Sequence, residues 1–218
     1  MNEPVKKMDQ TPESYSPKIK PWIVNLVEKV TVEEAEEMKQ NHSVKLAKLE
    51  YLHLPALRFI GKDVIASGPD AGNQYGLMWA KSGEIFSVLD QMENYASLLR
   101  DNCALMHHDN LDGNHPMHYI VGRFMKAESS VPEGFDYYDI PASCAALAIY
   151  YGEFNDMIDQ AYTMTRDRIL ADGRGIPYPV GYYHAEVYVP ANIPKDGVVS
   201  QLGYLFSCNK DNQNERTS

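Results

Sequence analysis

The sequence predicts an α+β fold: a duplicated strand–helix–strand–strand module forming one curved antiparallel sheet, with two main helices on one face and a central ligand groove. The chain repeats itself at one offset, which aligns Tyr51 with Tyr137 and Pro55 with Pro141. A strand-like apolar run follows each proline. A helical pattern and two more strand-like runs then follow in each copy. The groove is expected where the two halves meet.

The chain before the repeat, residues 1–44, is predicted to be an N-terminal extension. Its first twenty residues are polar and contain prolines, a composition typical of disordered segments. Thr31 followed by Glu34 matches a capping box, which predicts a short helix over residues 31–40. The ligand-binding domain is then expected to span residues 45–208, with a polar tail over residues 209–218.

The first copy continues from the strand-like LRFIG after Pro55. A helix is expected to begin near Tyr75, and its apolar residues recur at helical spacing between residues 85 and 99. Gly83 is a possible interruption of that helix. Two strands are then predicted, over residues 103–108 and 118–126, because a turn-rich stretch separates them.

The second copy begins with the strand-like AALAIYYG. Apolar residues at helical spacing from Phe154 to Thr165 predict a helix that ends before Asp172 and Gly173. A Gly- and Pro-broken loop follows. Two final strands are predicted, over residues 182–190 and 197–208.

Composition narrows the classes of function. The chain of 218 residues has a formal net charge of −10, which repels phosphate backbones and argues against direct nucleic-acid binding. No apolar run approaches the roughly 20 residues of a membrane-spanning helix, and the first residues do not resemble a secretion signal. The three cysteines are expected to be reduced, mostly buried thiols. We therefore expect a cytoplasmic protein with no membrane contact and no cofactor.

The most informative side chain is a glutamate inside a strand. Strand alternation places Tyr182, His184, Glu186 and Tyr188 on one face. Glutamate is unusual in the middle of a strand rich in Tyr and Val. It is either solvated on an open sheet face or buried, and a buried carboxylate must be paired, protonated or available to a cation.

Several stretches together resemble a known family. GFDYYDIPASCAALAIYYG, a helix and the strand AEVYVP resemble the second half of the GyrI-like family, also known as the effector-binding domain of bacterial transcription activators. LEYLHLPALRFIGKDV, YGLMW and HYIVGRF resemble its first half. The resemblance covers roughly residues 45–190, and the order and spacing of the motifs are specific. The sequence departs from the family at the end of the second helix, in its N-terminal extension and in residues 197–208.

The resemblance implies a groove for lipophilic, often cationic, aromatic compounds. It places Glu186 facing the ligand and surrounds it with aromatic walls. Metal ligands are not expected. The predicted ligand-binding residues are Tyr75, Trp79, Tyr119, Tyr151, Glu186 and Tyr188.

Three functions remain open. The favoured one is binding of a small, cationic aromatic ligand, for sensing or sequestration of toxic compounds, as in multidrug binding. The second is a hydrolase in which Glu186 acts as the general base that adds water to electrophilic, cyclopropane-type aromatic compounds. The third is a protein-interaction module of the gyrase-inhibitor type. A protein partner or a homodimer is compatible with each.

Histidines and acids also gather before the strand at residues 118–126. Their spacing matches no zinc signature, and the loop lacks the acid alternation of a calcium site. We therefore expect a turn with exposed histidines and no metal. The residues concerned are His107, His108, His115, His118, Asp109 and Asp112.

Overall fold

The computed structural model describes residues 32–66, 71–92, 102–108, 117–177, 181–188 and 200–209. The predictions for residues 1–31 and for the tail after residue 209 lie outside these ranges. The described elements are α1 (Val32–Asn41), β1 (Lys45–Leu54), β2 (Leu57–Ala66), α2 (Ala71–Ala80), α3 (Ser82–Leu89), β3 (Asn102–His107), β4 (Met117–Lys126), β5 (Asp136–Ile140), β6 (Ser143–Gly152), α4 (Phe154–Ala171), β7 (Tyr183–Tyr188) and β8 (Ser200–Cys208).

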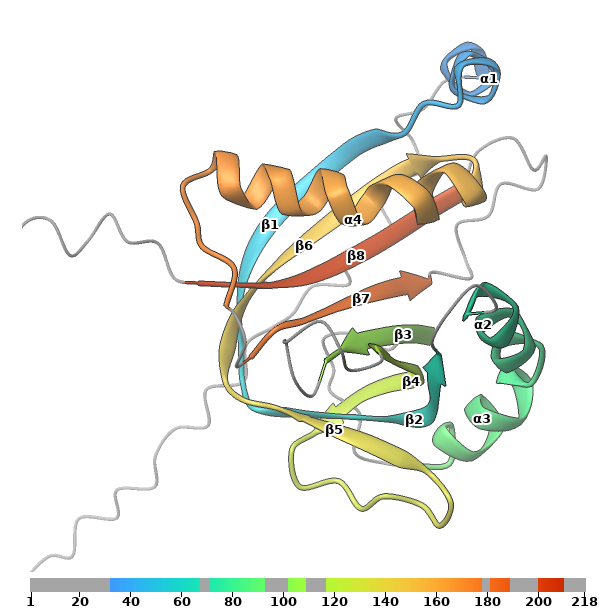
Figure 1. Ribbon diagram of the computed structural model, residues 1–218, viewed down its shortest axis with the longest axis vertical. Helices are drawn as coiled ribbons and strands as arrows, with labels where there is room; N and C mark the ends of the chain where they lie inside the picture. The colour runs from blue at the N-terminus through green and yellow to red at the C-terminus, as the bar shows by residue number, and fades with distance from the viewer. Residues whose placement is uncertain are drawn as a thin grey trace, which may run out of the picture.

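The fold class is confirmed: the described strands form one curved, eight-stranded antiparallel sheet in an α+β protein (Figure 1). The strand order is β1-β6-β8-β7-β3-β4-β2-β5. A pseudo-twofold axis therefore passes between β7 and β3, the strands at the centre of the sheet. The last predicted strand, β8, lies inside the sheet between β6 and β7 and completes the second half.

The internal repeat is also confirmed. β2 and β6 each begin two residues after the repeated proline, Pro55 or Pro141, and each is ten residues long. The structure adds one strand to the start of each half, β1 and β5. Each added strand pairs with the other half of the molecule, β1 with β6 and β5 with β2. This exchange joins the two halves by backbone hydrogen bonds at both edges of the sheet.

The helices follow the predicted positions with one refinement. The first helix is divided into α2 and α3 at Lys81, two residues before the predicted interruption at Gly83. The predicted continuation to residue 99 extends beyond α3, which ends at Leu89, and residues 93–99 lie outside the described ranges. α4 ends at Ala171, and Gly173 has a φ of 76°, a left-handed conformation that glycine adopts readily after a helix.

Both main helical groups cover the same face of the sheet. α4 packs on alternate residues of β6 and β8, among them Ala146 and Phe206. α3 packs on alternate residues of β3 and β4, among them Ala104 and Val121. The register pairs these residues through β7, so they share one face. The opposite face is lined by a second apolar cluster that includes Leu147.

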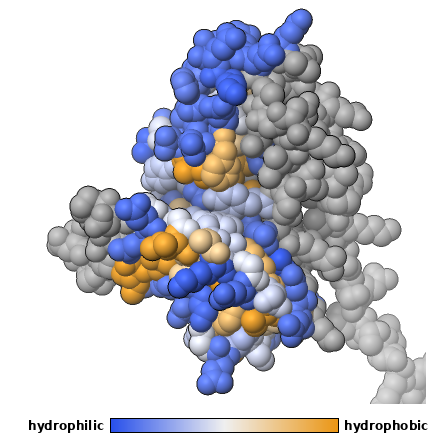
Figure 2. All heavy atoms as spheres, turned by 90° about the vertical axis from the view of Figure 1, so that its right-hand side faces the viewer, coloured by the Kyte–Doolittle hydropathy of each residue, from blue (hydrophilic) through white to orange (hydrophobic). Residues whose placement is uncertain are grey.

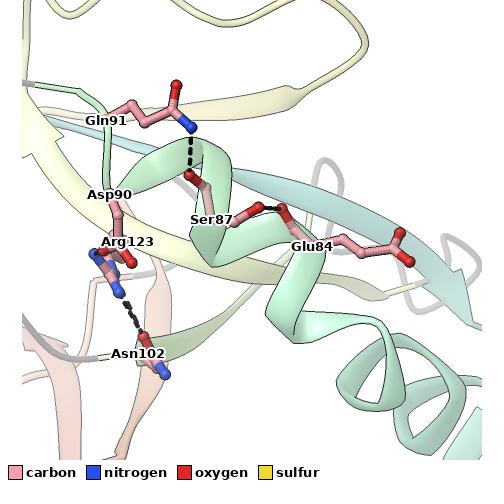
Figure 3. Close-up of polar contacts among 6 residues, drawn as sticks. All are labelled: Glu84, Ser87, Asp90, Gln91, Asn102 and Arg123. Atoms are coloured by element: carbon pink, nitrogen blue, oxygen red, sulfur yellow. Dashed lines mark hydrogen bonds and ion pairs between the residues drawn. The ribbon is translucent and has the colours of Figure 1, made fainter.

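A partly buried arginine holds the end of α3 against the sheet. The Arg123 guanidinium, on β4, forms an ion pair with Asp90 and donates to Oδ1 of Asn102 at 3.3 and 2.9 Å (Figure 3). It also lies 5.0 Å from the centre of the Phe86 ring. Gln91 donates through Nε2 to the backbone of α3 at 3.1 Å. These contacts hold α3 against the sheet.

All three cysteines are buried, as expected. Within the described ranges, no helix is long and apolar enough to cross a membrane.

Candidate functional site

Glu186 lies in the middle of β7, next to the pseudo-twofold axis. It is paired in register with Ala104 on β3 and Tyr204 on β8, and all three face the helices. The predicted alternation is thus confirmed, since His184 and Tyr188 face the same way. The position lies between the region covered by α4 and the region covered by α2 and α3.

The Glu186 side chain is buried, with an exposed fraction of 7%. Two tyrosine hydroxyls donate to the same carboxylate oxygen, Oε2: Tyr119 at 3.0 Å and Tyr188 at 2.5 Å. Within the described part of the chain, no donor reaches Oε1 and no basic side chain forms an ion pair with the carboxylate. The site is therefore a buried acid with two hydrogen bonds, one uncommitted oxygen and no positive partner among these residues.

The electrostatics follow from burial. Loss of hydration raises the pKa of Glu186, and the hydrogen bonds from Tyr188 and Tyr119 act in the opposite direction because they stabilise the ionised form. Burial and the negative charge of Glu186 together raise the pKa of Tyr119, Tyr188 and Tyr204. The tyrosine hydroxyls consequently stay protonated and remain donors at physiological pH.

Aromatic rings from both sides of the axis cover the carboxylate. Trp79, on α2, donates through Nε1 to the Tyr119 hydroxyl at 2.9 Å, so a chain of donors runs from Trp79 through Tyr119 to Glu186. Tyr75 stacks on Tyr119 with ring centres 4.1 Å apart. Trp79 and Tyr188 pack edge to face, with their ring centres 4.5 Å apart. Phe154, at the start of α4, has its ring centre 5.9 Å from that of Tyr188.

The histidine nearest along β7 does not supply a positive charge. Burial, together with the charge of His108, lowers the pKa of His184 to about 3, so its imidazole is neutral at physiological pH. Its Nδ1 lies 2.6 Å from the Tyr204 hydroxyl. His184 therefore belongs to a neutral aromatic layer beside Glu186. This layer also includes Phe206, whose ring centre lies 5.6 Å from that of His184.

The structure brings five of the six predicted ligand-binding residues together: Tyr75, Trp79, Tyr119, Glu186 and Tyr188. Their role in binding a ligand stays a prediction.

Tyr151 is the exception. It follows Ile149 on the sheet face opposite the helices, because successive strand residues alternate between faces. Its neighbour Tyr150 faces the helices instead, and its hydroxyl lies 2.7 Å from that of Thr165 on α4. Tyr151 therefore does not join the cluster around Glu186, and its role in binding a ligand stays a prediction.

Sequence reasoning missed two residues at the site. Tyr204 is directly opposite Glu186 in register, and Phe154 brings the second helix to it. The signal for Tyr204 was its alternation with Phe206 along β8. That alternation shows that both residues share a face, but it does not reveal which strand β8 pairs with.

The histidine region differs from expectation. His107 is buried rather than exposed, and its ring stacks on Tyr138 at 3.9 Å and on His118 at 4.6 Å. His118 contacts the carboxylate of Asp63. Residues 109–116, which include the remaining predicted cluster members apart from His108, lie outside the described ranges.

One group of described residues has the composition of a metal site. His42, Glu153 and Asp156 meet where α1 approaches the start of α4, with candidate ligand atoms within 4.8 Å of one another. His42 is exposed and lies 3.2 Å from Asp156, while Lys39 lies 3.9 Å from Glu153. Ordinary surface ion pairs account for this arrangement.

A cavity of about 370 Å³ lies beside α2 and α3. Its lining consists of Lys62, Met78, Lys81, Glu84, Ile85, Val88 and Phe135. Figure 2 faces the side of the molecule that carries these helices and shows apolar surface there between hydrophilic regions. Its lining includes none of the Glu186 cluster. We centre the candidate site on Glu186 because it is a buried acid with convergent donors, whereas the charged residues that line this cavity, Lys62, Lys81 and Glu84, are not buried.

Comparison with known proteins supports the fold. No protein-family model and no curated protein match the sequence. Among solved structures, SAV2435 bound to tetraphenylphosphonium is similar over 75% of this chain and 94% of its own, with 12% identity and a TM-score of 0.52. EcmrR, solved in a complex with DNA, is similar over 75% of this chain, with 17% identity and a TM-score of 0.52. This chain spans 57% of the EcmrR chain.

Each of these similarities extends over three quarters of this chain and is a likeness of fold. The chain thus has the fold of a GyrI-like effector-binding domain, as the sequence resemblance implied.

Proposed function

We propose that this protein binds small, lipophilic aromatic cations at Glu186, with the carboxylate as the counter-charge and the surrounding rings as the walls. The observation that carries the proposal is the buried carboxylate without a basic partner among the described residues, enclosed by Trp79, Tyr119 and Tyr188. A structural acid at such a depth is normally paired with a base, because burying an unpaired charge is unfavourable.

A bound cation would offset the unfavourable burial of this charge. At about 5 Å and an effective dielectric constant of about 20, two unit charges attract by about 3 kcal/mol. This corresponds to roughly 100-fold in affinity. The faces of the tyrosine and tryptophan rings would add cation–π attraction of about 0.5–2 kcal/mol.

The rings that cover Glu186 would have to give way to a ligand. Tyr75, Trp79 and Tyr188 are only partly buried, and Phe154 is 47% exposed, so their movement disrupts less packing than movement of a core side chain would. Tyr119 is buried and remains as the floor beside the acid. Oε1 of Glu186 stays available to a donor on the ligand.

Charge-selective binding tests the proposal. Tetraphenylphosphonium, the compound bound in the SAV2435 structure, is the cationic probe, and triphenylphosphine oxide is a neutral aromatic counterpart. Calorimetry should show that Glu186→Gln lowers the affinity for the cation roughly 100-fold and the affinity for the neutral compound less than about threefold. The exposed Glu133→Gln is the matched control and should leave both affinities unchanged. Equal losses for the two compounds would rule out the counter-charge role.

The hydrolase is the second candidate function, and the uncommitted Oε1 favours it. A carboxylate with a raised pKa and one open oxygen can accept a proton from a water molecule held beside an electrophilic ligand. Mass spectrometry of electrophilic, cyclopropane-containing aromatic compounds distinguishes the two functions. Gain of one water by the compound with wild type, lost with Glu186→Gln, would identify an enzyme. Binding without a mass change would support the binding protein.

We infer that such binding serves sensing or sequestration of toxic compounds in the cytoplasm. The formal net charge of −10 disfavours direct contact with nucleic acid, so a regulatory role would act through a protein partner or a homodimer.

A further inference from the structure

Two cysteines lie directly opposite each other at one end of the sheet. Cys144, on β6, and Cys208, on β8, are register partners in the antiparallel ladder. Both side chains lie on the helix-bearing face, where they belong to the same apolar cluster, and both are buried. The pair is separate from the Glu186 site, because Cys208 is four residues further along β8 than Tyr204.

This register satisfies the main geometric requirement for a disulfide. Directly opposed residues in an antiparallel pair have Cα atoms about 4.5–5.5 Å apart. Disulfides bridge Cα atoms about 4.4–6.8 Å apart. The Cβ atoms of such a pair are about 4.5–5.5 Å apart, and a disulfide holds them at about 3.5–4.5 Å, so closure requires a shift of about 1 Å.

The surroundings of the two thiols differ in a way that assigns them different roles. His53, on β1, places Nδ1 3.2 Å from Sγ of Cys144, and its exposed ring can accept the thiol proton. Cys208 contacts the Arg174 guanidinium, yet burial raises the pKa of its thiol to about 11. Cys144 is therefore the thiol with a neighbouring base, and Cys208 is the thiol that stays protonated until it reacts.

We propose that Cys144 and Cys208 form an oxidisable dithiol that closes a reversible disulfide between β6 and β8 when hydrogen peroxide reaches Cys144. His53 takes the proton of Cys144, and the thiolate attacks one peroxide oxygen. The O–O bond breaks, the leaving oxygen is released as water after it gains a proton, and Cys144 becomes a sulfenic acid. The Cys208 sulfur then attacks the Cys144 sulfur and displaces a second water, to which the Cys208 thiol contributes its proton. With hydrogen peroxide, two thiols and one peroxide yield one disulfide and two waters.

The third cysteine provides an internal control. Cys103 lies on β3, where its register partners are Gly122 and Val187. It belongs to the cluster on the opposite face of the sheet. Because the sheet separates Cys103 from the pair, oxidation should leave it as a thiol.

The test treats the full-length reduced protein with stoichiometric hydrogen peroxide and follows its intact mass and its non-reducing peptide map. Wild type and Cys103→Ser should each lose two hydrogen atoms and give a Cys144–Cys208 cross-linked peptide, which dithiothreitol reverses. Cys144→Ser and Cys208→Ser should form no such cross-link. His53→Gln should form the same cross-link about tenfold more slowly, since it lacks the base.

Three results would overturn the proposal. One is a wild-type protein that keeps all its hydrogens under these conditions. Another is a cross-link that contains Cys103 or joins two chains. The third is oxidation of Cys144 to a sulfinic acid at the same rate in wild type and Cys208→Ser, which would show that Cys208 does not intercept the sulfenic acid.

Discussion

Removing the Tyr119 hydroxyl should destabilise the protein through two partners at once. This hydroxyl accepts from Trp79 at 2.9 Å and donates to Glu186 at 3.0 Å. A neutral hydrogen bond contributes about 1 kcal/mol to stability, and one to a charged group about 1.5–3 kcal/mol. Tyr119→Phe should therefore lower the free energy of unfolding by about 2–4 kcal/mol at pH 8. Tyr137→Phe, at an exposed tyrosine, is the control and should change it by less than about 0.5 kcal/mol.

The effect should depend on pH. The Tyr119 hydroxyl favours the ionised form of Glu186, so its removal raises the pKa of the folded-state carboxyl further above the ordinary value of 4.5. The loss of stability should be largest above that folded-state pKa. It should shrink as pH falls toward 4.5, because the carboxyl is then protonated in both variants.

Urea unfolding of wild type, Tyr119→Phe, Glu186→Gln and the double variant separates the contributions. The two substitutions should be coupled by about 1–2 kcal/mol, since both weaken the same hydrogen bond. Additive effects, or a Tyr119→Phe protein as stable as wild type at pH 8, would refute the interaction between the hydroxyl and the carboxylate.

Two further predictions concern stability. The pKa of His184 is lowered from 6.5 to about 3 in the folded protein, so its contribution is fully present above about pH 6.5 and is lost as pH falls toward 3. His184→Gln should reduce the change in the urea midpoint of unfolding between pH 7 and pH 4. The same pH dependence in both proteins would contradict the lowered pKa of His184. A Cβ at Gly122 would lie 2.0 Å from the Ile60 carbonyl oxygen, so Gly122→Ala should destabilise the fold by several kcal/mol. Gly83→Ala, on open helical surface, should be neutral or stabilising by about 0.5–1 kcal/mol, and similar losses at both sites would contradict the close strand contact.

The fold could be predicted as far as its repeated and apolar segments allowed. The central strands carry apolar runs, and α4 ends at the predicted Asp172–Gly173 turn. The two strands that were missed, β1 and β5, form the edges of the sheet. Edge strands carry many polar side chains, and their sequences KLAKLEYLHL and DYYDI therefore lack the apolar signal of a buried strand.

The site could be predicted only where the signal was local. Alternation along one strand is a local property, so the residues that share a face with Glu186 were predicted correctly. The pairing of Glu186 with Tyr204 depends on register between strands, which no local pattern specifies. Tyr151 lies outside the cluster because α4 covers the face of β6 that carries Tyr150, and no local pattern specifies which face a distant helix covers.

The most direct test of the central claim is the number of protons exchanged when tetraphenylphosphonium binds, obtained by calorimetry in buffers of different ionisation enthalpy. A cation beside Glu186 favours the ionised carboxylate and lowers its pKa. At a pH below the pKa of the free protein's Glu186, wild type should release up to one proton per cation bound, and Glu186→Gln should release none. Equal proton release in the two proteins, or binding that is independent of pH in wild type, would contradict the account.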